Sequence, residues 1–317
     1  MVIAGSLYPF TSHFLNLDPH NLHYLDEGQG DTLLMVHGNP TWSFYYRNLI
    51  LALKKSYRCV VPDHMGMGKS DKPQNYSYTL SKHIDNLESL VDKLELNDIT
   101  LMLHDWGGAI GMGFAVRHPQ KIKRIVLFNT AAFLSNKIPF RLRLCRIPVL
   151  GTLAIRGFNA FALAAVNMAS KNKERMTDQV REGYLAPYNN YANRIANLRF
   201  VQDIPMDSNA PSFSILKNIE ENLAQFGSLP VLIAWGAKDF VFTDQFLNRW
   251  KKIFPDAEVH WVPDAGHYVV EDAHEYILPL MKEFFPMIFY LLTCEASPYF
   301  DQSFYLNQKK LHFLNVP

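Results

Sequence analysis

One carboxylate in this sequence stands where a nucleophile is expected. Residues 103–119, LHDWGGAIGMGFAVRHP, join an apolar strand to a glycine-rich turn and then to an apolar helix. Such a strand–turn–helix junction presents a nucleophile at its tip, and the usual motif is G-x-S-x-G. Asp105 takes the place of the serine, Gly107 keeps the later glycine, and Leu103 replaces the earlier one. The pattern predicts Asp105 as a nucleophile, with a helix N-cap carboxylate as the alternative.

An aspartate changes the chemistry expected of this junction. Serine must lose a proton before it attacks, whereas aspartate, with a reference pKa of about 3.9, is already a carboxylate at neutral pH. It can displace a leaving group from carbon and form an alkyl ester with the enzyme. A histidine is then free to activate water, which attacks the ester carbonyl.

Two further residues complete a candidate catalytic triad. His267 follows the strand-like run AEVHWVPDAGH, which agrees with the chain order nucleophile, acid, histidine. Asp239 ends the run VLIAWGAKD, where a carboxylate can orient the imidazole and stabilise its cation. The end of the preceding run, RIVLFNT, offers Asn129 and Thr130, and neither is acidic. We therefore expect Asp239 to be the acid, with a solvated turn residue as the alternative.

A second catalytic region is VHGNPTWSFYYRNL, residues 36–49. Backbone N–H groups after this strand and after the nucleophile can form an oxyanion hole. Asn39 adds a side-chain amide donor and Trp106 adds an indole N–H, so two neutral donors can point at one departing anion. The alternative is that Asn39 only makes a turn and that Trp106 only packs.

These residues must be positioned by a sheet. Short apolar runs that end in polar or turn residues are typical of buried parallel strands; they lie at 33–38, 58–64, 99–105, 124–130, 231–239 and 257–267. The stretch 79–96 has helical spacing of its apolar residues. Each candidate residue follows or ends a strand, and ligands of open α/β sheets bind at the carboxyl ends of the strands.

Residues 133–225, between the runs 124–130 and 231–239, lack such short apolar runs, and their sequence favours helices. The sequence therefore predicts an α/β fold with a mostly parallel, doubly wound sheet and an inserted helical cap. We expect residues 1–132 and 226–290 to form the core, 133–225 the cap segment, and 291–317 a C-terminal extension. The aromatic tail after Phe285 is interpreted as an interaction segment for a protein partner or for self-association, with a partly ordered extension as the alternative.

Composition narrows the classes of partner. The chain has 317 residues, with 31 Lys and Arg against 30 Asp and Glu. This balance argues against a nucleic-acid or acidic-membrane partner, although it leaves room for a local basic patch. Three widely spaced cysteines indicate reduced thiols without a zinc site, hence a cytoplasmic protein. No signal peptide and no spanning segment are expected.

The motifs together identify a family. HGNPTWSFYYR, VPDHMGMGKSDKP, HDWGGAIG and DAGHYVVEDA closely resemble the haloalkane dehalogenases of the α/β-hydrolase superfamily, and the resemblance runs from Leu22 to Phe285. It implies Asp105 as nucleophile, His267 as base, Asp239 as acid, and Asn39 with Trp106 as halide ligands. It also implies a helical cap and no cofactor. The apolar and aromatic residues of the cap segment indicate a small apolar organic substrate, and we expect no metal site. The leading expectation is hydrolysis of carbon–halogen bonds to alcohol and halide.

Three segments of the cap point to a narrower group. Residues 147–165, 183–194 and 199–205 look most like a branch that includes the β-lactone decarboxylases of long-chain olefin biosynthesis, which resemble dehalogenases in every residue named above. Such a decarboxylase is the alternative. Epoxide hydrolases use two cap tyrosines, for which Tyr184 and Tyr188 are available, but Asn39 argues against them. A third possibility is a non-catalytic binding protein with the same fold. The intact candidate triad argues against it, because a binding protein has no need of these three residues.

Overall fold

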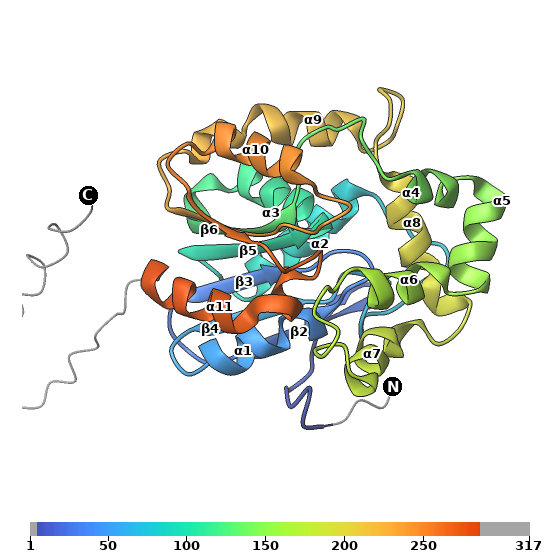
Figure 1. Ribbon diagram of the computed structural model, residues 1–317, viewed down its shortest axis with the longest axis horizontal. Helices are drawn as coiled ribbons and strands as arrows, with labels where there is room; N and C mark the ends of the chain where they lie inside the picture. The colour runs from blue at the N-terminus through green and yellow to red at the C-terminus, as the bar shows by residue number, and fades with distance from the viewer. Residues whose placement is uncertain (1–4, 286–317) are drawn as a thin grey trace, which may run out of the picture. The chain divides into compact units, whose positions relative to one another are not determined.

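The structure is a computed structural model that describes residues 5–285 (Figure 1). The predicted extension 291–317, its interaction role and Cys294 lie outside the described residues. One sheet has the order β1-β2-β4-β3-β5-β6-β7-β8. Its strands are β1 (His13–Leu17), β2 (His20–Glu27), β3 (Thr32–Val36), β4 (Arg58–Pro62), β5 (Ile99–Asp105), β6 (Ile122–Thr130), β7 (Val231–Gly236) and β8 (Glu258–Val262).

Helices connect the strands and lie on both faces of the sheet (Figure 1). Those outside the cap segment are α1 (Arg47–Leu53), α2 (Leu80–Lys93), α3 (Trp106–Arg117), α10 (Asp244–Ile253) and α11 (Val269–Phe284). Between β6 and β7 lie α4 (Phe140–Cys145), α5 (Pro148–Gly151), the π-helix η3 (Thr152–Gly157), α6 (Ala160–Met168), α7 (Asp178–Leu185), α8 (Ile195–Asp203) and α9 (Phe213–Glu221).

The strands from β3 to β8 pair in parallel, and their sequences explain why. In β3, β5 and β7 every residue is buried, because helices cover both faces of a parallel sheet. These six strands agree with the predicted runs. The antiparallel pair β1 and β2 was not predicted. In β1 partly buried and exposed residues alternate. This period-2 pattern ahead of the turn at Asp18-Pro19 could have indicated the first strand of the hairpin.

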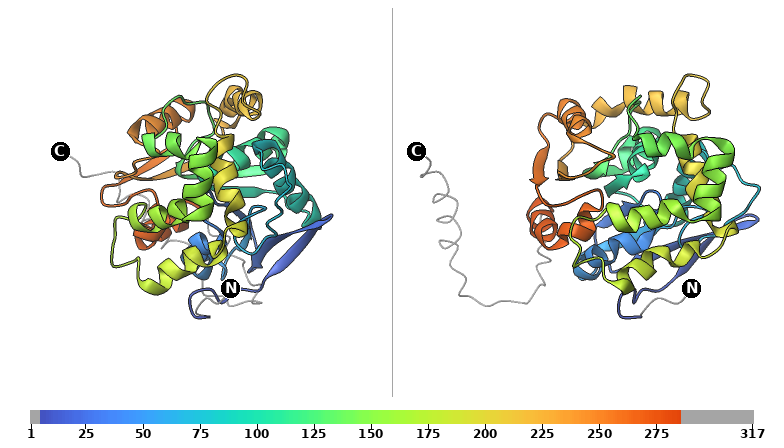
Figure 2. Two further views of the ribbon diagram at one scale, coloured as in Figure 1. Left: turned by 90° about the vertical axis from the view of Figure 1, so that its right-hand side faces the viewer. Right: turned by 45° about the vertical axis from the view of Figure 1, so that its right-hand side comes forward.

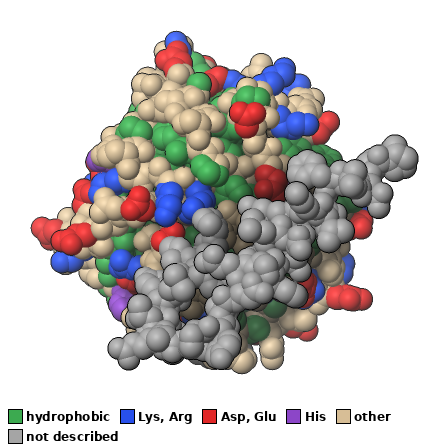
Figure 3. Space-filling model, turned by 90° about the vertical axis from the view of Figure 1, so that its left-hand side faces the viewer, with side chains coloured by type: hydrophobic (Ala, Val, Ile, Leu, Met, Phe, Trp, Pro, Cys, Tyr) green, Lys and Arg blue, Asp and Glu red, His purple; other side chains and the backbone are tan. Residues whose placement is uncertain are grey.

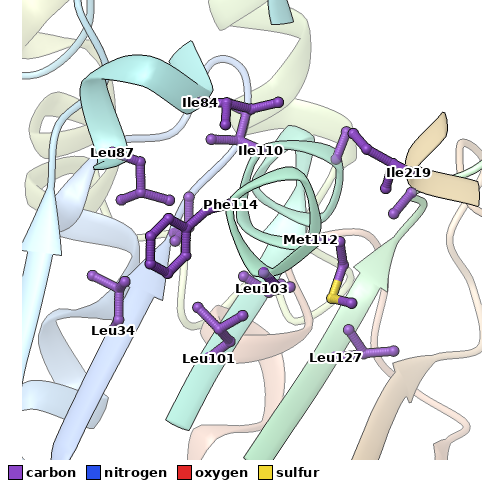
Figure 4. Close-up of a cluster of buried hydrophobic side chains, with 14 of the residues drawn as sticks. Leu34, Ile84, Leu87, Leu101, Leu103, Ile110, Met112, Phe114, Leu127 and Ile219 are labelled. Carbon is purple, nitrogen blue, oxygen red and sulfur yellow. The ribbon is translucent and has the colours of Figure 1, made fainter. Parts of the chain in front are cut away.

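The largest apolar cluster lies on one face of the sheet. Alternate residues of each strand point to this face, so Leu101 and Leu103 of β5 contribute while Met102 between them does not. Helix α3 lies over the centre of this face (Figure 4). The cluster holds the start of α3 at the end of β5, which fixes the position of Asp105.

The cap segment has its own small core. Ile155 of η3 packs with Leu198 and Val201 of α8, and Leu142 and Phe161 from α4 and α6 join them. Figure 2 shows these helices grouped together on one side of the sheet. No single helix within residues 5–285 is both long and apolar enough to cross a membrane. The division of the chain at 133 and 225 stays a prediction.

Candidate active site

Asp105 stands at a sharp turn between β5 and α3. Its backbone has φ +51° and ψ −125°, a conformation that costs a non-glycine residue about 1–3 kcal/mol. The turn is tight because α3 begins against the end of β3: a Cβ on Gly107 would lie 2.0 Å from the carbonyl oxygen of Val36. Thr130 Oγ1 donates to the carbonyl oxygen of Asp105 and ties the turn to β6.

The two carboxylate oxygens of Asp105 have different surroundings. Oδ1 accepts the backbone N–H of Asn39 at 2.7 Å, and the backbone N–H of Trp106 also contacts the carboxylate. Position 38 must be glycine because a Cβ there would lie 2.1 Å from Oδ1. Oδ2 faces His267 instead. Burial raises the pKa of Asp105, and His267 and the two N–H groups offset only part of that effect.

His267 is held between two carboxylates. Its Nδ1–H donates to Asp239 Oδ2 at 2.9 Å, and its Nε2 lies 3.6 Å from Asp105 Oδ2. Asp239 follows β7, and its Oδ1 accepts the backbone N–H of Val241 at 2.6 Å. Burial opposes the imidazolium, but the charges of Asp239 and Asp105 outweigh it and leave the pKa of His267 raised. The three predicted triad residues therefore meet, and each is less than a tenth exposed.

The two predicted donors also lie beside Asp105. Asn39 and Trp106 line the same cavity as the carboxylate. Asn39 Nδ2 donates to the backbone oxygen of Asn197 at 3.1 Å, which engages one of its two N–H bonds and fixes the amide. The ring of Trp106 meets Phe200 edge to face, with ring centroids 5.3 Å apart. Whether either donor binds a leaving group stays a prediction.

A cavity of about 700 Å³ covers these residues, and its size suits an organic ligand. The strand ends supply Asn39, Asp105, Trp106 and His267 to one wall. The opposite wall comes from the cap segment and is mostly apolar; it includes Phe140, Leu142, Phe161, Ala165, Met168 and Val201.

The two tyrosines considered for epoxide chemistry do not line this cavity. Tyr184 donates its hydroxyl to Glu271 Oε2 at 2.6 Å, and Glu271 in turn pairs with Arg47. Tyr188 is fully buried. Neither hydroxyl is placed to activate a ligand beside Asp105, which adds to the argument against an epoxide hydrolase.

Three neighbours of the triad were missed by sequence reasoning. The ring of Phe242 stacks against that of His267, with centroids 5.7 Å apart. His104 donates from Nε2 to the backbone oxygen of His267 at 2.8 Å. Asn197 reaches Asn39 from the cap segment. Phe242 lies in the loop after β7, and His104 and Asn197 belong to elements remote from their partners, so no local pattern signals these contacts.

Within residues 5–285 no group of three or more His, Cys, Asp or Glu is arranged to hold an ion. Cys59 and Cys145, the cysteines among the described residues, form no disulfide.

Known proteins resemble this chain over most of its length. The family model of the alpha/beta hydrolase fold matches residues 31–273. A cis-3-alkyl-4-alkyloxetan-2-one decarboxylase of Shewanella oneidensis is 48% identical over 89% of this chain and 90% of its own. The enzyme of the same name from Xanthomonas campestris pv. campestris is 41% identical, covering 87% of this chain and 96% of its own.

Dehalogenases are more distant relatives. Haloalkane dehalogenase 2 of Mycobacterium bovis is 33% identical over 88% of this chain and 96% of its own. The crystal structure of haloalkane dehalogenase DbeA from Bradyrhizobium elkani superimposes with a TM-score of 0.80 at 24% identity, over 87% of this chain and 97% of that one. That structure supports the predicted fold. The chain belongs to the α/β-hydrolase family and is an enzyme of its dehalogenase-like branch.

Proposed function

We propose that this enzyme decarboxylates cis-3,4-dialkyl β-lactones, which are cis-3-alkyl-4-alkyloxetan-2-ones, to alkenes. The proposal adopts the alternative of the sequence analysis in place of its leading expectation, because the relatives named for this activity are 41–48% identical and the dehalogenase 33%. The observation that carries the chemistry is a carboxylate, Asp105, with one free oxygen facing His267 in a largely apolar cavity.

The first step opens the lactone ring. Asp105 Oδ2 attacks C4, the ring carbon that bears the ring oxygen, and the C4–O bond breaks with inversion. The electron pair leaves with the ring oxygen, so the lactone carbonyl becomes a free carboxylate while C4 is esterified to Asp105. The side-chain amide N–H of Asn39 and the indole N–H of Trp106 stabilise the negative charge that develops on the leaving oxygen.

The second step releases both products. The bond between C3 and the carboxylate carbon breaks, and its electrons form the C3=C4 double bond. The C4–Oδ2 bond breaks at the same time and returns its electron pair to Asp105. An anti elimination after inversion converts a cis lactone to a cis alkene and CO₂, and no water is consumed. Loss of neutral CO₂ also relieves the cost of holding a carboxylate among apolar side chains.

His267 has a role in this reaction although no water is activated. Its raised pKa favours the imidazolium, which lies 3.6 Å from Asp105 Oδ2. A positive charge there stabilises the aspartate carboxylate as it departs from C4. Asp239 orients the ring and supports the cation.

Haloalkane hydrolysis is the second candidate, and the backbone N–H groups that contact the Asp105 carboxylate favour it. After a halide leaves, His267 would act as base for a water that attacks the aspartyl ester. The backbone N–H of Asn39, which donates to Oδ1, would then stabilise the oxyanion formed there, and the backbone N–H of Trp106 also contacts the carboxylate.

Isotope labelling separates the two reactions. Wild-type enzyme in H₂¹⁸O is given a cis-3,4-dialkyl β-lactone or a bromoalkane, and the peptide that contains Asp105 is weighed. Decarboxylation breaks the bond between C4 and Oδ2, so we expect alkene, CO₂ and an unlabelled Asp105. Hydrolysis breaks the acyl–oxygen bond instead and leaves ¹⁸O in Asp105. Rapid bromide release with a labelled peptide, and little alkene, would replace the proposal by the dehalogenase.

The variant His267→Gln sharpens the result. If the enzyme is instead the dehalogenase, the variant given a bromoalkane should release about one bromide per enzyme and carry the mass of the alkyl group on the Asp105 peptide, because general-base loss typically slows ester hydrolysis ~10²–10⁴-fold. With the β-lactone we expect slower alkene formation and the mass of the intact lactone on the same peptide. A 3-hydroxy acid as the main product in wild type would contradict decarboxylation.

A further inference from the structure

The outer side of the cap segment carries an unusual number of exposed apolar side chains. They lie on α4, α5, η3 and α6, which contact one another in sequence, and include Phe140, Val149, Leu150, Leu153, Phe158 and Leu163. Val149 is 72% exposed and Phe158 76%. We name this surface the apolar cap face; the helices that carry it are turned to the viewer in the left panel of Figure 2. Clusters of this kind mark interaction sites.

The inner sides of the same helices already have partners. Leu142 of α4, Ile155 of η3 and Phe161 of α6 pack against α8. A helix at the surface of a globular protein is apolar toward the core and polar toward water. These helices are apolar on both sides, so the outer side is suited to a second apolar environment.

Charge on this part of the chain has one sign. Residues 131–173 contain seven Lys and Arg and no Asp or Glu, while the rest of the chain has 24 basic against 30 acidic residues. Lys137, Arg141 and Arg143 are exposed, and among the described residues none of the seven forms an ion pair. The surface away from the cap mixes both signs (Figure 3). The near-neutral total therefore includes a locally basic segment, for which the composition leaves room.

The cavity reaches the same surface. Phe140 and Arg141 of α4 and Ala160 and Ala164 of α6 are exposed and also line the cavity above Asp105. The helical stretches Pro148–Gly157 and Ala160–Met168 together are apolar and as long as a membrane segment, although they are bent by 67° at the break between them. A bent pair at the rim of a cavity fits a segment that lies in a bilayer interface.

We infer that the apolar cap face docks on an anionic phospholipid bilayer, with α4 to α6 lying in the plane of the interface. Apolar side chains enter the boundary between headgroups and acyl chains, and the basic residues face lipid phosphates. The cavity then opens toward lipid, where an apolar substrate dissolves. A second copy of this face is a poorer partner, because a two-fold interface would oppose two surfaces of the same positive sign. The inference rests on surface side chains and not on the proposed reaction.

Vesicle binding by the full chain tests the inference directly. The protein is sedimented with vesicles of phosphatidylglycerol and phosphatidylethanolamine, and with vesicles of phosphatidylcholine alone. We expect strong binding to the first and weak binding to the second, and we expect added salt to weaken the first because it screens exposed charges. The variant Arg143→Gln should weaken anionic binding about fivefold.

Matched triple variants show whether the apolar face is responsible. Val149→Ser, Leu153→Ser and Phe158→Ser together should weaken vesicle binding about a hundredfold, since the buried apolar area is lost. The control combines Phe14→Ser, Leu51→Ser and Trp261→Ser, which remove exposed apolar side chains from β1, α1 and β8. The control should bind as wild type does. Neither set lines the cavity, so both should keep wild-type turnover of a short, water-soluble β-lactone, or of a bromoalkane if that is the substrate.

Three results would overturn the inference. One is wild-type protein that stays in the supernatant with anionic vesicles. Another is equal loss of binding in the two triple variants. The third is wild-type self-association, measured by analytical ultracentrifugation, that the cap triple variant abolishes without any lipid binding; a second copy would then cover the face. Turnover in the same samples reports on the proposed function separately.

Discussion

The strand ends and the cap segment enclose one cavity with opposite kinds of side chain. The strand ends bring together the charged and hydrogen-bonding groups, Asp105, His267 and Asp239, at fixed distances. The cap segment adds a mostly apolar wall, and its helices α4 to α6 add an outer surface that is apolar and basic. The first region sets which bonds can be made and broken, and the second sets which molecules arrive there.

This difference explains why two activities share one set of residues. Relatives named as decarboxylases and as dehalogenases match the chain over most of its length. The chemistry of a carboxylate nucleophile is common to both proposed reactions, so the strand ends do not discriminate between them. The cap segment and the fate of the aspartyl ester must do so, and substitutions in the two regions should have effects of different kinds.

The largest effect is expected at the nucleophile. Asp105→Ala should lower turnover about 10⁵–10⁶-fold, because the proposed ester forms on this carboxylate. The variant should fold, since it removes a buried carboxylate whose pKa is raised by burial. Product formation by gas chromatography and a thermal melt measure the two properties. Residual turnover within a hundredfold of wild type, in protein free of contaminating enzyme, would remove Asp105 from its role.

The second-largest loss of turnover is expected at Asp239. Asp239→Asn is expected to slow turnover about 10³–10⁴-fold through a wrong imidazole tautomer. The matched control is Asp264→Asn, because Asp264 is 93% exposed and pairs with Lys238 at the surface. A near-normal rate in Asp239→Asn would assign the acid to another residue.

The same variant should change the pH profile. The proposed decarboxylation uses ionised Asp105 and protonated His267. Activity should therefore fall as pH drops through the raised pKa of Asp105 and as pH rises through the raised pKa of His267. Asp239→Asn removes a charge that raises the pKa of His267, so the alkaline limb of kcat should move to lower pH. An unmoved limb would contradict the coupling.

A smaller loss of turnover is expected when the leaving-group donor Trp106 is changed. Trp106→Phe keeps the aromatic packing and removes the indole N–H, and turnover should fall about 10²–10³-fold. Trp261→Phe is the control, since Trp261 is 42% exposed on β8. If the leaving-group role is correct, the loss should appear in ring opening, measured as the rate of adduct formation on Asp105. Equal rates in the two variants would leave Trp106 as a packing residue.

Cap substitutions should change selectivity and leave the chemistry alone. Ala165→Leu adds volume to the apolar wall formed by α6, so the ratio of kcat/KM for long against short alkyl chains should fall about ten- to a hundredfold. Leu163→Phe, on the exposed side of the same helix, is the control. Turnover of the shortest substrate should match wild type in both. A uniform loss for every chain length would give α6 a part in catalysis.

The smallest effect on activity is expected where the cap segment meets the core. Asp203 at the end of α8 accepts the backbone N–H of Leu80 and the hydroxyl of Ser212, and burial raises the pKa of Asp203 to about 6. A raised pKa means that the folded protein holds this proton more tightly, so its stabilisation is complete below pH 4 and is lost as pH rises through about 6.

The substitution Asp203→Asn tests this contact between the cap segment and the core. Between pH 4 and pH 7 the free energy of unfolding of wild type should fall relative to the variant by roughly 2–3 kcal/mol. Urea unfolding at both pH values measures the difference, and turnover of a short substrate should be unchanged. Parallel pH dependence in the two proteins would show that Asp203 titrates normally.

Much of the parallel sheet could be predicted from local sequence patterns. Continuous apolar runs identified six parallel strands, and helical spacing identified α2, because both signals are written within a few residues. The turn after β5 marked Asp105 for the same reason. The hairpin of β1 and β2 was missed because β1 is a five-residue strand at the edge of the sheet, where burial is incomplete, and because β2 mixes polar and apolar residues and has no continuous apolar run.

The sequence by itself determined which residue types were available for chemistry and in what order they follow the strands. Only the tertiary structure decided that His267 reaches both Asp239 and Asp105, that Tyr184 turns to Glu271, and that the cap helices are apolar on both sides. Those facts depend on contacts between residues far apart in the chain. Local propensity acts within a turn or a strand, whereas a catalytic distance is set by how whole elements pack.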